Sequence, residues 1–168
     1  MTRAATYQAR KTQTGDRHPG SPKLALAVQY ASNSDADLPT RAQVRHWVRA
    51  AQQMDVIVTV RFVDAIEGRV INARFRGNDY ATNVLTFVYD DDSPRAGDIV
   101  LCAPMVRQEA AAQSKTLAAH FTHLVVHGML HLQGYDHERD ADAAAMEARE
   151  TAILARLRLP DPYGVAAT

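Results

Sequence analysis

The stretch that most constrains the fold runs from residue 117 to residue 132 and predicts a helix that is apolar on almost every side. Such a helix leaves little of its surface for water and lies at the centre of a core. Its polar residues are chiefly His120, His123, His127 and His131, which fall on one side at 3.6 residues per turn. Burying several imidazoles together is costly unless a ligand or partner satisfies them. We therefore expect the chain to pack around this helix and a ligand to occupy its histidine side.

A second regularity extends past the helix, because His127, His131 and His137 follow one another at spacings of four and six. Residues four apart stack on one helix face, and Gly134 can end the helix in the left-handed conformation. The chain can then turn back and bring His137 to the same point. Three histidines leave the fourth position of a tetrahedral zinc open, as in catalytic sites, and nickel or another divalent ion also suits imidazole ligands.

Two other interpretations of these histidines stay open. They could be helix-face histidines that bind no metal. His123 lies one turn before His127 and could be a fourth ligand, which would close the site and make it structural. We prefer a supporting or core role for His123, because the turn at Gly134 makes His137 the better-placed third ligand.

The spacing H-x-x-x-H-x-x-G-x-x-H is also the zinc pattern of the metzincin proteases. In those enzymes a glutamate follows the first histidine and serves as general base. This chain has Gly128 there, and a positioned acid or base contributes about 10²–10⁴-fold to a rate. The sequence therefore argues against proteolysis. The same metal cage could polarise a phosphoryl oxygen while an arginine holds the phosphate.

The 168 residues suit one domain with a core. Residues 1–23 are polar, carry a net charge of +4 and predict a flexible tail, so that 24–168 form the domain. Alternating or β-branched runs predict strands at 24–30, 55–63, 82–88 and 98–102. Helical spacing and start signals predict helices at 40–51, 64–75, 104–115, 117–132 and 138–158.

Three of these helices rest on specific residues. Thr40 and Gln43 form a capping-box pattern at the start of the first helix. The second helix is predicted from apolar residues at spacings of four and three: Ile66, Val70 and Ala73. In the last helix the residues that could pack inward are Met146, Ile153, Leu154 and Leu157.

Composition excludes little on its own. Nineteen basic residues balance nineteen acidic ones, although seven arginines in 41–76 face three acidic residues, as a solvated surface or a phosphate-facing patch would. Cys102 is the one cysteine, so no internal disulfide can form. No apolar run has the length of a membrane span, and we expect a soluble cytoplasmic protein. The acidic run 90–92 predicts an exposed turn rather than a Mg²⁺ site.

The stretch His-Gly-Met-Leu-His-Leu-Gln-Gly-Tyr-Asp-His, residues 127–137, resembles the signature of the YbeY family, the endoribonucleases and rRNA maturation factors of bacteria. Other blocks resemble the family in the family's order: Phe75-Arg76-Gly77, Asp79-Tyr80, Thr82-Asn83-Val84-Leu85-Thr86-Phe87, Gly97-Asp98-Ile99-Val100, and His123 before Val125-Val126-His127. The resemblance covers residues 24–163. The tail lies outside it, the loop at 90–96 is unusually acidic for an RNA enzyme, and Thr86 stands where the family usually has serine.

The resemblance implies one compact α/β (α+β) domain, with a small mixed sheet flanked by helices and the histidine-bearing helix at its centre. It implies a zinc ion held by His127, His131 and His137, and metal-dependent cleavage of single-stranded RNA. The partners it implies are an rRNA precursor, in 16S rRNA 3′-end maturation and ribosome quality control, and the small ribosomal subunit or ribosome-associated factors. Arg76 matches the family's functionally important arginine.

Three functions therefore compete: an endoribonuclease, a metzincin-like metallopeptidase, and a non-catalytic ribosome-assembly factor with structural zinc. In the first, we expect Arg76 to stabilise charge that develops on the phosphoryl group, the alternative being a structural surface arginine. Asp136 is either a support for a ligand histidine or a turn residue. The general base, and whether water or the RNA 2′-hydroxyl attacks, stay open at this stage.

Overall fold

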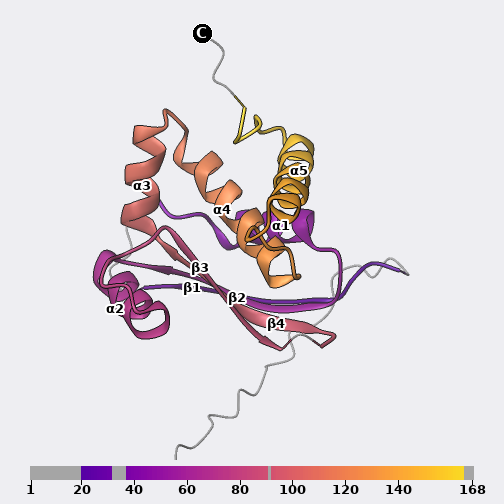
Figure 1. Ribbon diagram of the computed structural model, residues 1–168, viewed down its shortest axis with the longest axis horizontal. Coiled ribbons are helices and arrows are strands. Elements are labelled where there is room, and N and C mark those ends of the chain that lie inside the picture. The colour runs from indigo at the N-terminus through magenta and orange to yellow at the C-terminus, as the bar shows by residue number, and fades with distance from the viewer. Residues whose placement is uncertain (1–19, 32–36, 91, 165–168) are drawn as a thin grey trace, which may run out of the picture.

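The computed structural model describes residues 20–31, 37–90 and 92–164, so most of the predicted tail lies outside the described part. One mixed sheet has the strand order β1-β2-β4-β3. Strands β1, β2 and β4 run parallel, and β3 runs antiparallel to β4. The strands are β1 (Leu24–Tyr30), β2 (Val56–Val63), β3 (Val84–Asp90) and β4 (Arg95–Cys102). The predicted single domain with a small mixed sheet is confirmed (Figure 1).

The helices follow the predicted order. They are α1 (Arg41–Ala51), α2 (Ala65–Arg76), α3 (Ala103–Ala112), α4 (Leu117–Leu132) and α5 (Asp140–Arg156). The capping box predicted at the start of α1 forms, with the Thr40 and Gln43 side chains each accepting from the other's backbone N–H. Helices α3 and α5 end earlier than predicted, because Ser114 (φ 53°) and Arg158 (φ 62°) take left-handed conformations just past each end.

Helix α4 lies at the centre of the molecule, as its apolar surface predicts. It contacts β3 and β4 beneath it and also packs against α1, α3 and α5 (Figure 1). Alternate residues of each strand face this helix layer, and in β2 these are Val56, Val58, Val60 and Phe62, all nearly inaccessible to water. This alternation is the pleat of a strand whose two faces have different partners. The sheet therefore holds α4 from below and fixes where its histidines lie.

Helix α2 packs against the opposite face of the sheet. Its Ile71 contacts a small second core that includes Val100 and Cys102, and Cys102 is buried there as a small apolar residue. The apolar residues whose spacing predicted this helix are not its buried face, however, since Ile66 is 78% and Val70 is 58% exposed. The second core is too small to cover more than one side of α2.

The loop between β3 and β4 is shorter than predicted. Strand β3 continues to Asp90, and β4 begins at Arg95 rather than at Asp98, with a register shift between Val88 and Asp90. The shift lets the two strands stay paired although the sequence pattern breaks. The carboxylate of Asp90 accepts a hydrogen bond from the backbone N–H of Asp92 (2.9 Å), as in an exposed turn. In the described part of the chain, no helix has the length and apolar character needed to cross a membrane.

Candidate metal centre

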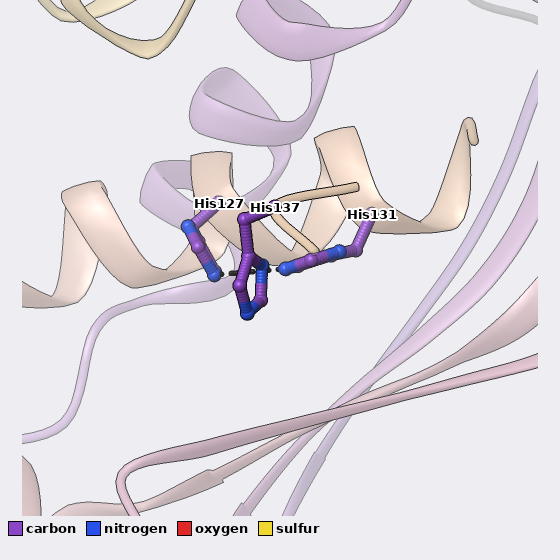
Figure 2. Close-up of side chains that lie close together, drawn as sticks. All are labelled: His127, His131 and His137. Atoms are coloured by element: carbon purple, nitrogen blue, oxygen red, sulfur yellow. Dashed lines mark hydrogen bonds between the residues drawn. The ribbon is translucent and has the colours of Figure 1, made fainter. Parts of the chain in front are cut away.

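The three histidines of the motif converge on one point beside α4. His127 and His131 project from successive turns of the helix, and their Nε2 atoms lie 3.0 Å apart. His137 joins them from the loop after the helix, and one ligand nitrogen from each ring lies within 4.8 Å of the other two (Figure 2). Two nitrogens bound to one tetrahedral zinc at about 2.0–2.1 Å lie about 3.3 Å apart. The observed spacing therefore fits a shared metal ion.

The hydrogen bonds behind the first two rings decide which nitrogens face the centre. Nδ1 of His127 lies 2.5 Å from the Glu150 carboxylate, and Nδ1 of His131 lies 3.0 Å from the carbonyl oxygen of Tyr135. Both partners are acceptors, so in the neutral rings both protons reside on Nδ1. The two Nε2 atoms then present lone pairs to each other at 3.0 Å. Two facing lone pairs repel, and a cation between them removes the repulsion.

The loop that carries His137 begins with a left-handed residue. Gly134 has φ of 102°, a conformation that a side chain would strain, and it ends the helical path as predicted. The Tyr135 backbone N–H donates back to the carbonyl of Leu130 (3.0 Å), which places the Tyr135 carbonyl beside His131. The Asp136 carboxylate accepts from the backbone N–H groups of His137 and Glu138, at 2.6 and 3.2 Å. Of the two roles considered for Asp136, these contacts support the turn role.

A buried amide anchors this loop to α1. Gln133 is 5% exposed, and its side chain donates to the carbonyls of Ala51 (2.9 Å) and Met129 (3.0 Å). Its side-chain oxygen accepts from the backbone N–H of Gln53 (2.6 Å). Every hydrogen-bonding group of the amide is thereby engaged, which is the condition for burying it. The start of the loop therefore has a fixed position relative to the helix that carries His131.

The electrostatics keep the centre receptive to a cation. Burial, together with the neighbouring His127 and His137, lowers the pKa of His131 to about 4, so this ring is neutral near pH 7. Burial alone would raise the pKa of Glu150, but hydrogen bonds from His123, His127 and the Tyr163 hydroxyl outweigh it and bring this pKa to about 2. A neutral ligand ring thus lies near a buried negative charge, an arrangement that attracts a metal cation.

The geometry favours neither His123 as a fourth ligand nor a peptidase base at position 128. His123 hydrogen-bonds to Glu150 instead, with Nε2 3.0 Å from the carboxylate, and does not belong to the group of His127, His131 and His137. His137 is exposed, so the centre opens to the surface. A Cβ atom at Gly128 would lie 2.8 Å from Cγ2 of Ile99 in the sheet, so this backbone leaves no room there for a glutamate.

Arg76 lies on a different element from the histidines. It is the last residue of α2, it is exposed, and its guanidinium donates to the Thr86 carbonyl on the edge strand β3 (3.3 Å). Thr86 pairs with Ile99 of β4, the residue against which Gly128 packs. Directly opposite residues of an antiparallel pair lie about 4.5–5.5 Å apart. Arg76 therefore lies beside the sheet at the level of the helix turn that bears the ligands, and it does not hydrogen-bond to them within the described chain.

Sequence reasoning did not identify Glu150, the residue that connects the most groups behind the centre. It is fully buried on α5 and contacts His123, His127 and the Tyr163 hydroxyl. A signal was present, because Glu150 falls at helical spacing between Met146 and Leu154 on the predicted buried face. A carboxylate at a core position needs a charged or hydrogen-bonding partner. Gln133 and Tyr163 gave no comparable signal.

Comparisons with known proteins agree with this fold. The family model described as Endoribonuclease YbeY matches residues 29–158. A relative from Nitrosomonas europaea named Endoribonuclease YbeY is 55% identical over 141 residues, covering 84% of this chain and 85% of the relative. One of the same name from Thiobacillus denitrificans is 54% identical over 145 residues, covering 85% of this chain and 98% of the relative. The solution structure of a Thermotoga maritima protein matches with a TM-score of 0.53 at 26% identity, covering 83% of this chain and 99% of that one.

Proposed function

This chain belongs to the YbeY family of endoribonucleases, and on that basis we propose that it cleaves single-stranded RNA with one zinc ion held by His127, His131 and His137. The observation that carries the metal is the pair of Nε2 atoms of His127 and His131, 3.0 Å apart with both Nδ1 atoms facing acceptors. Nickel or another divalent ion would suit the same three imidazoles.

A bound zinc ion would supply a Lewis acid that polarises a phosphoryl oxygen and activates water. The chain's own residues provide the positioning. His131 stays neutral because its pKa is lowered to about 4, and its Nδ1 proton is fixed on the Tyr135 carbonyl. Arg76 is exposed at the end of α2 and can hold a phosphate with its planar guanidinium. In this proposal it stabilises the charge that develops on the phosphoryl group.

The competing functions have less support. A metallopeptidase of the metzincin kind needs a general base after the first histidine, and Gly128 packs against Ile99 with no room for one. A purely structural zinc takes four protein ligands. The group of His127, His131 and His137 contains three, with His137 exposed and His123 bonded elsewhere. We extend the proposal to the cellular role: an rRNA precursor as substrate, in 16S rRNA 3′-end maturation and ribosome quality control in the cytoplasm, with the small ribosomal subunit or its associated factors as partners.

One assay separates the three functions. Metal-quantified wild type and His131→Ala are each given a labelled single-stranded RNA and, separately, casein. We expect the wild type to carry zinc and cleave only the RNA, and His131→Ala to do neither. Casein cleavage would favour the peptidase. A metal-loaded wild type that binds pre-rRNA without cutting it would favour the assembly factor. Equal RNA cleavage by both proteins would overturn the proposal.

A further inference from the structure

The two carboxylate oxygens of Glu150 have different partners: one contacts a proposed metal ligand, and the other contacts two groups outside the three-histidine centre. Oε1 accepts a hydrogen bond from Nδ1 of His127 (2.5 Å). Oε2 accepts hydrogen bonds from Nε2 of His123 (3.0 Å) and from the Tyr163 hydroxyl (2.5 Å). The side chain of Glu150 has no exposed surface, so protein donors rather than bulk water satisfy both of its oxygens. The orientation of the carboxylate that His127 meets is thus set by the two groups on the other oxygen.

Tyr163 reaches Glu150 from a short turn beyond the end of α5. The Asp161 carboxylate accepts from the Tyr163 backbone N–H (2.8 Å) and from the Thr151 hydroxyl on α5 (3.2 Å). The Tyr163 ring stands edge-on to the His123 ring, with centroids 5.8 Å apart and planes at 89°. The turn is therefore tied to α5 by hydrogen bonds and to the histidine face by a ring contact.

We propose that Tyr163 is a positioning residue for the metal centre: acting through Glu150, it holds the His127 ring with its proton on Nδ1 and its Nε2 free for the metal. This inference rests on the proposed metal-binding function. A ligand histidine commonly donates its other ring N–H to a carboxylate, which fixes tautomer and orientation. Here the carboxylate needs its own restraint, because it hydrogen-bonds two histidines that face the same helix side.

The same residues do not form a second metal site. Ligand atoms of His123, His127 and Glu150 lie within 4.8 Å of one another. However, each histidine nitrogen already lies at hydrogen-bond distance from the carboxylate, at 3.0 and 2.5 Å. Each contact pairs a ring N–H donor with a carboxylate acceptor, so no lone pairs face each other and no cation is needed between the two atoms. These contacts are therefore hydrogen bonds that support His127, and one ion per chain is expected.

The Tyr163 hydroxyl remains a donor under ordinary conditions. Burial and its contact with the Glu150 carboxylate raise the pKa of Tyr163 well above its usual value. Removing the hydroxyl leaves the ring, and its contact with His123, in place. Tyr163→Phe is thus a conservative variant that deletes one hydrogen bond. The Glu150 carboxylate and the His127 ring lie between the deleted hydroxyl and the metal.

The test compares zinc affinity, measured by competition with a chromogenic chelator, in wild type, Tyr163→Phe and Glu150→Gln. Tyr89→Phe is the matched control, because the Tyr89 hydroxyl also donates to a carboxylate, that of Asp98, on the sheet face opposite α4. We expect Glu150→Gln to bind zinc about 10–100-fold more weakly and Tyr163→Phe about 3–10-fold more weakly. Tyr89→Phe should match the wild type. Nitrogen chemical shifts of metal-free His127 should show the Nδ1–H tautomer in wild type and a mixture in Tyr163→Phe.

Wild-type affinity together with wild-type His127 shifts in Tyr163→Phe would overturn the inference, as would a stoichiometry of two ions per chain. If Glu150→Gln fails to fold, Tyr163→Phe decides alone. The result is independent of catalysis. If the wild type binds zinc but cuts no RNA, the proposed function fails. The ratio of zinc affinities between wild type and Tyr163→Phe still tests the role of Tyr163. Equal affinities with normal RNA cleavage defeat only the role of Tyr163.

Discussion

Gly128 lies against Ile99 of β4 so closely that a Cβ atom at position 128 would come within 2.8 Å of Cγ2 of Ile99. Ile99 is fully buried and β-branched, so it has little freedom to move aside. The glycine lets α4 approach the sheet at the turn between His127 and His131. The contact that brings the ligand histidines close to the sheet therefore also leaves no space at position 128 for the glutamate that a metzincin peptidase uses as its base.

Substituting this glycine tests the contact. We expect Gly128→Ala to lower the free energy of unfolding by about 1–3 kcal/mol through overpacking, although alanine favours a helix by about 1 kcal/mol over glycine. In an Ile99→Ala background, the same change should be neutral or stabilising, because the crowding atoms are gone. Urea unfolding of the four proteins measures the coupling. If Gly128→Ala lowered the free energy of unfolding equally in both backgrounds, the close contact between Gly128 and Ile99 would be contradicted.

The lowered pKa of His131 predicts how the metal-free protein responds to acid. This pKa is about 4 in the folded state, against 6.5 for an ordinary histidine, so unfolding takes up protons between these values. Its contribution to stability is full above pH 6.5 and is lost as the pH falls toward 4. Burial lowers the pKa of His120 and acts in the same direction. Glu150, with a pKa of about 2 against 4.5, contributes fully above 4.5 and weakens only below it.

We therefore expect the free energy of unfolding, measured with a chelator present, to fall between about pH 7 and pH 4.5. His131→Gln should show a shallower fall over this range, since it removes the proton uptake of His131 and leaves that of His120. Denaturant titrations of both proteins across the range provide the measurement. Parallel curves for the two proteins would show that His131 does not titrate in this way.

Zinc should stabilise the fold through the three histidines. A ligand at 100 times its dissociation constant adds about 2.7 kcal/mol to the free energy of unfolding if it binds only the folded chain. We expect zinc to raise the melting temperature of the chelator-treated wild type and to leave that of His131→Ala nearly unchanged. His46→Ala is the matched control, because His46 is exposed on α1 and belongs to neither ligand group. An equal rise in His131→Ala would place the metal elsewhere.

Arg76 should affect RNA cleavage without affecting metal content. Loss of one donor to developing charge typically costs about 10²–10³ in kcat, and we expect a loss of this order for Arg76→Ala with zinc occupancy unchanged. Arg74→Ala is the matched control, since Arg74 is exposed on the same helix and lies over the Phe75 ring at 5.7 Å. Single-turnover cleavage assays measure both. Equal rates for Arg76→Ala and wild type would assign Arg76 a structural role on the Thr86 carbonyl.

The sequence was most informative where structure depends on local spacing. The bounds of α4, its central place, and the meeting of His127, His131 and His137 all follow from helical periodicity and one glycine. The three ligand histidines lie within eleven residues, so no knowledge of the tertiary fold is needed to bring them together. Strand alternation likewise located β1, and a run of β-branched residues located β2, each to within a residue.

Long-range relations were harder to predict. Glu150 contacts His127 because α5 packs against α4. Tyr163 contacts Glu150 because the chain turns again after α5. The apolar spacing of Ile66 and Val70 identified α2 but not its buried side, since the second core covers only part of the helix. The start of β4 depended on a register shift that no sequence period marks.

The central claim is that one metal ion in the three-histidine centre is required for RNA cleavage. The most direct measurement follows the cleavage rate of a labelled single-stranded RNA as zinc is titrated into metal-free protein. We predict negligible cleavage without metal, a rise in proportion to occupancy, and a plateau at one zinc per chain. Full cleavage by the metal-free protein, or no cleavage at one zinc per chain, would contradict the claim.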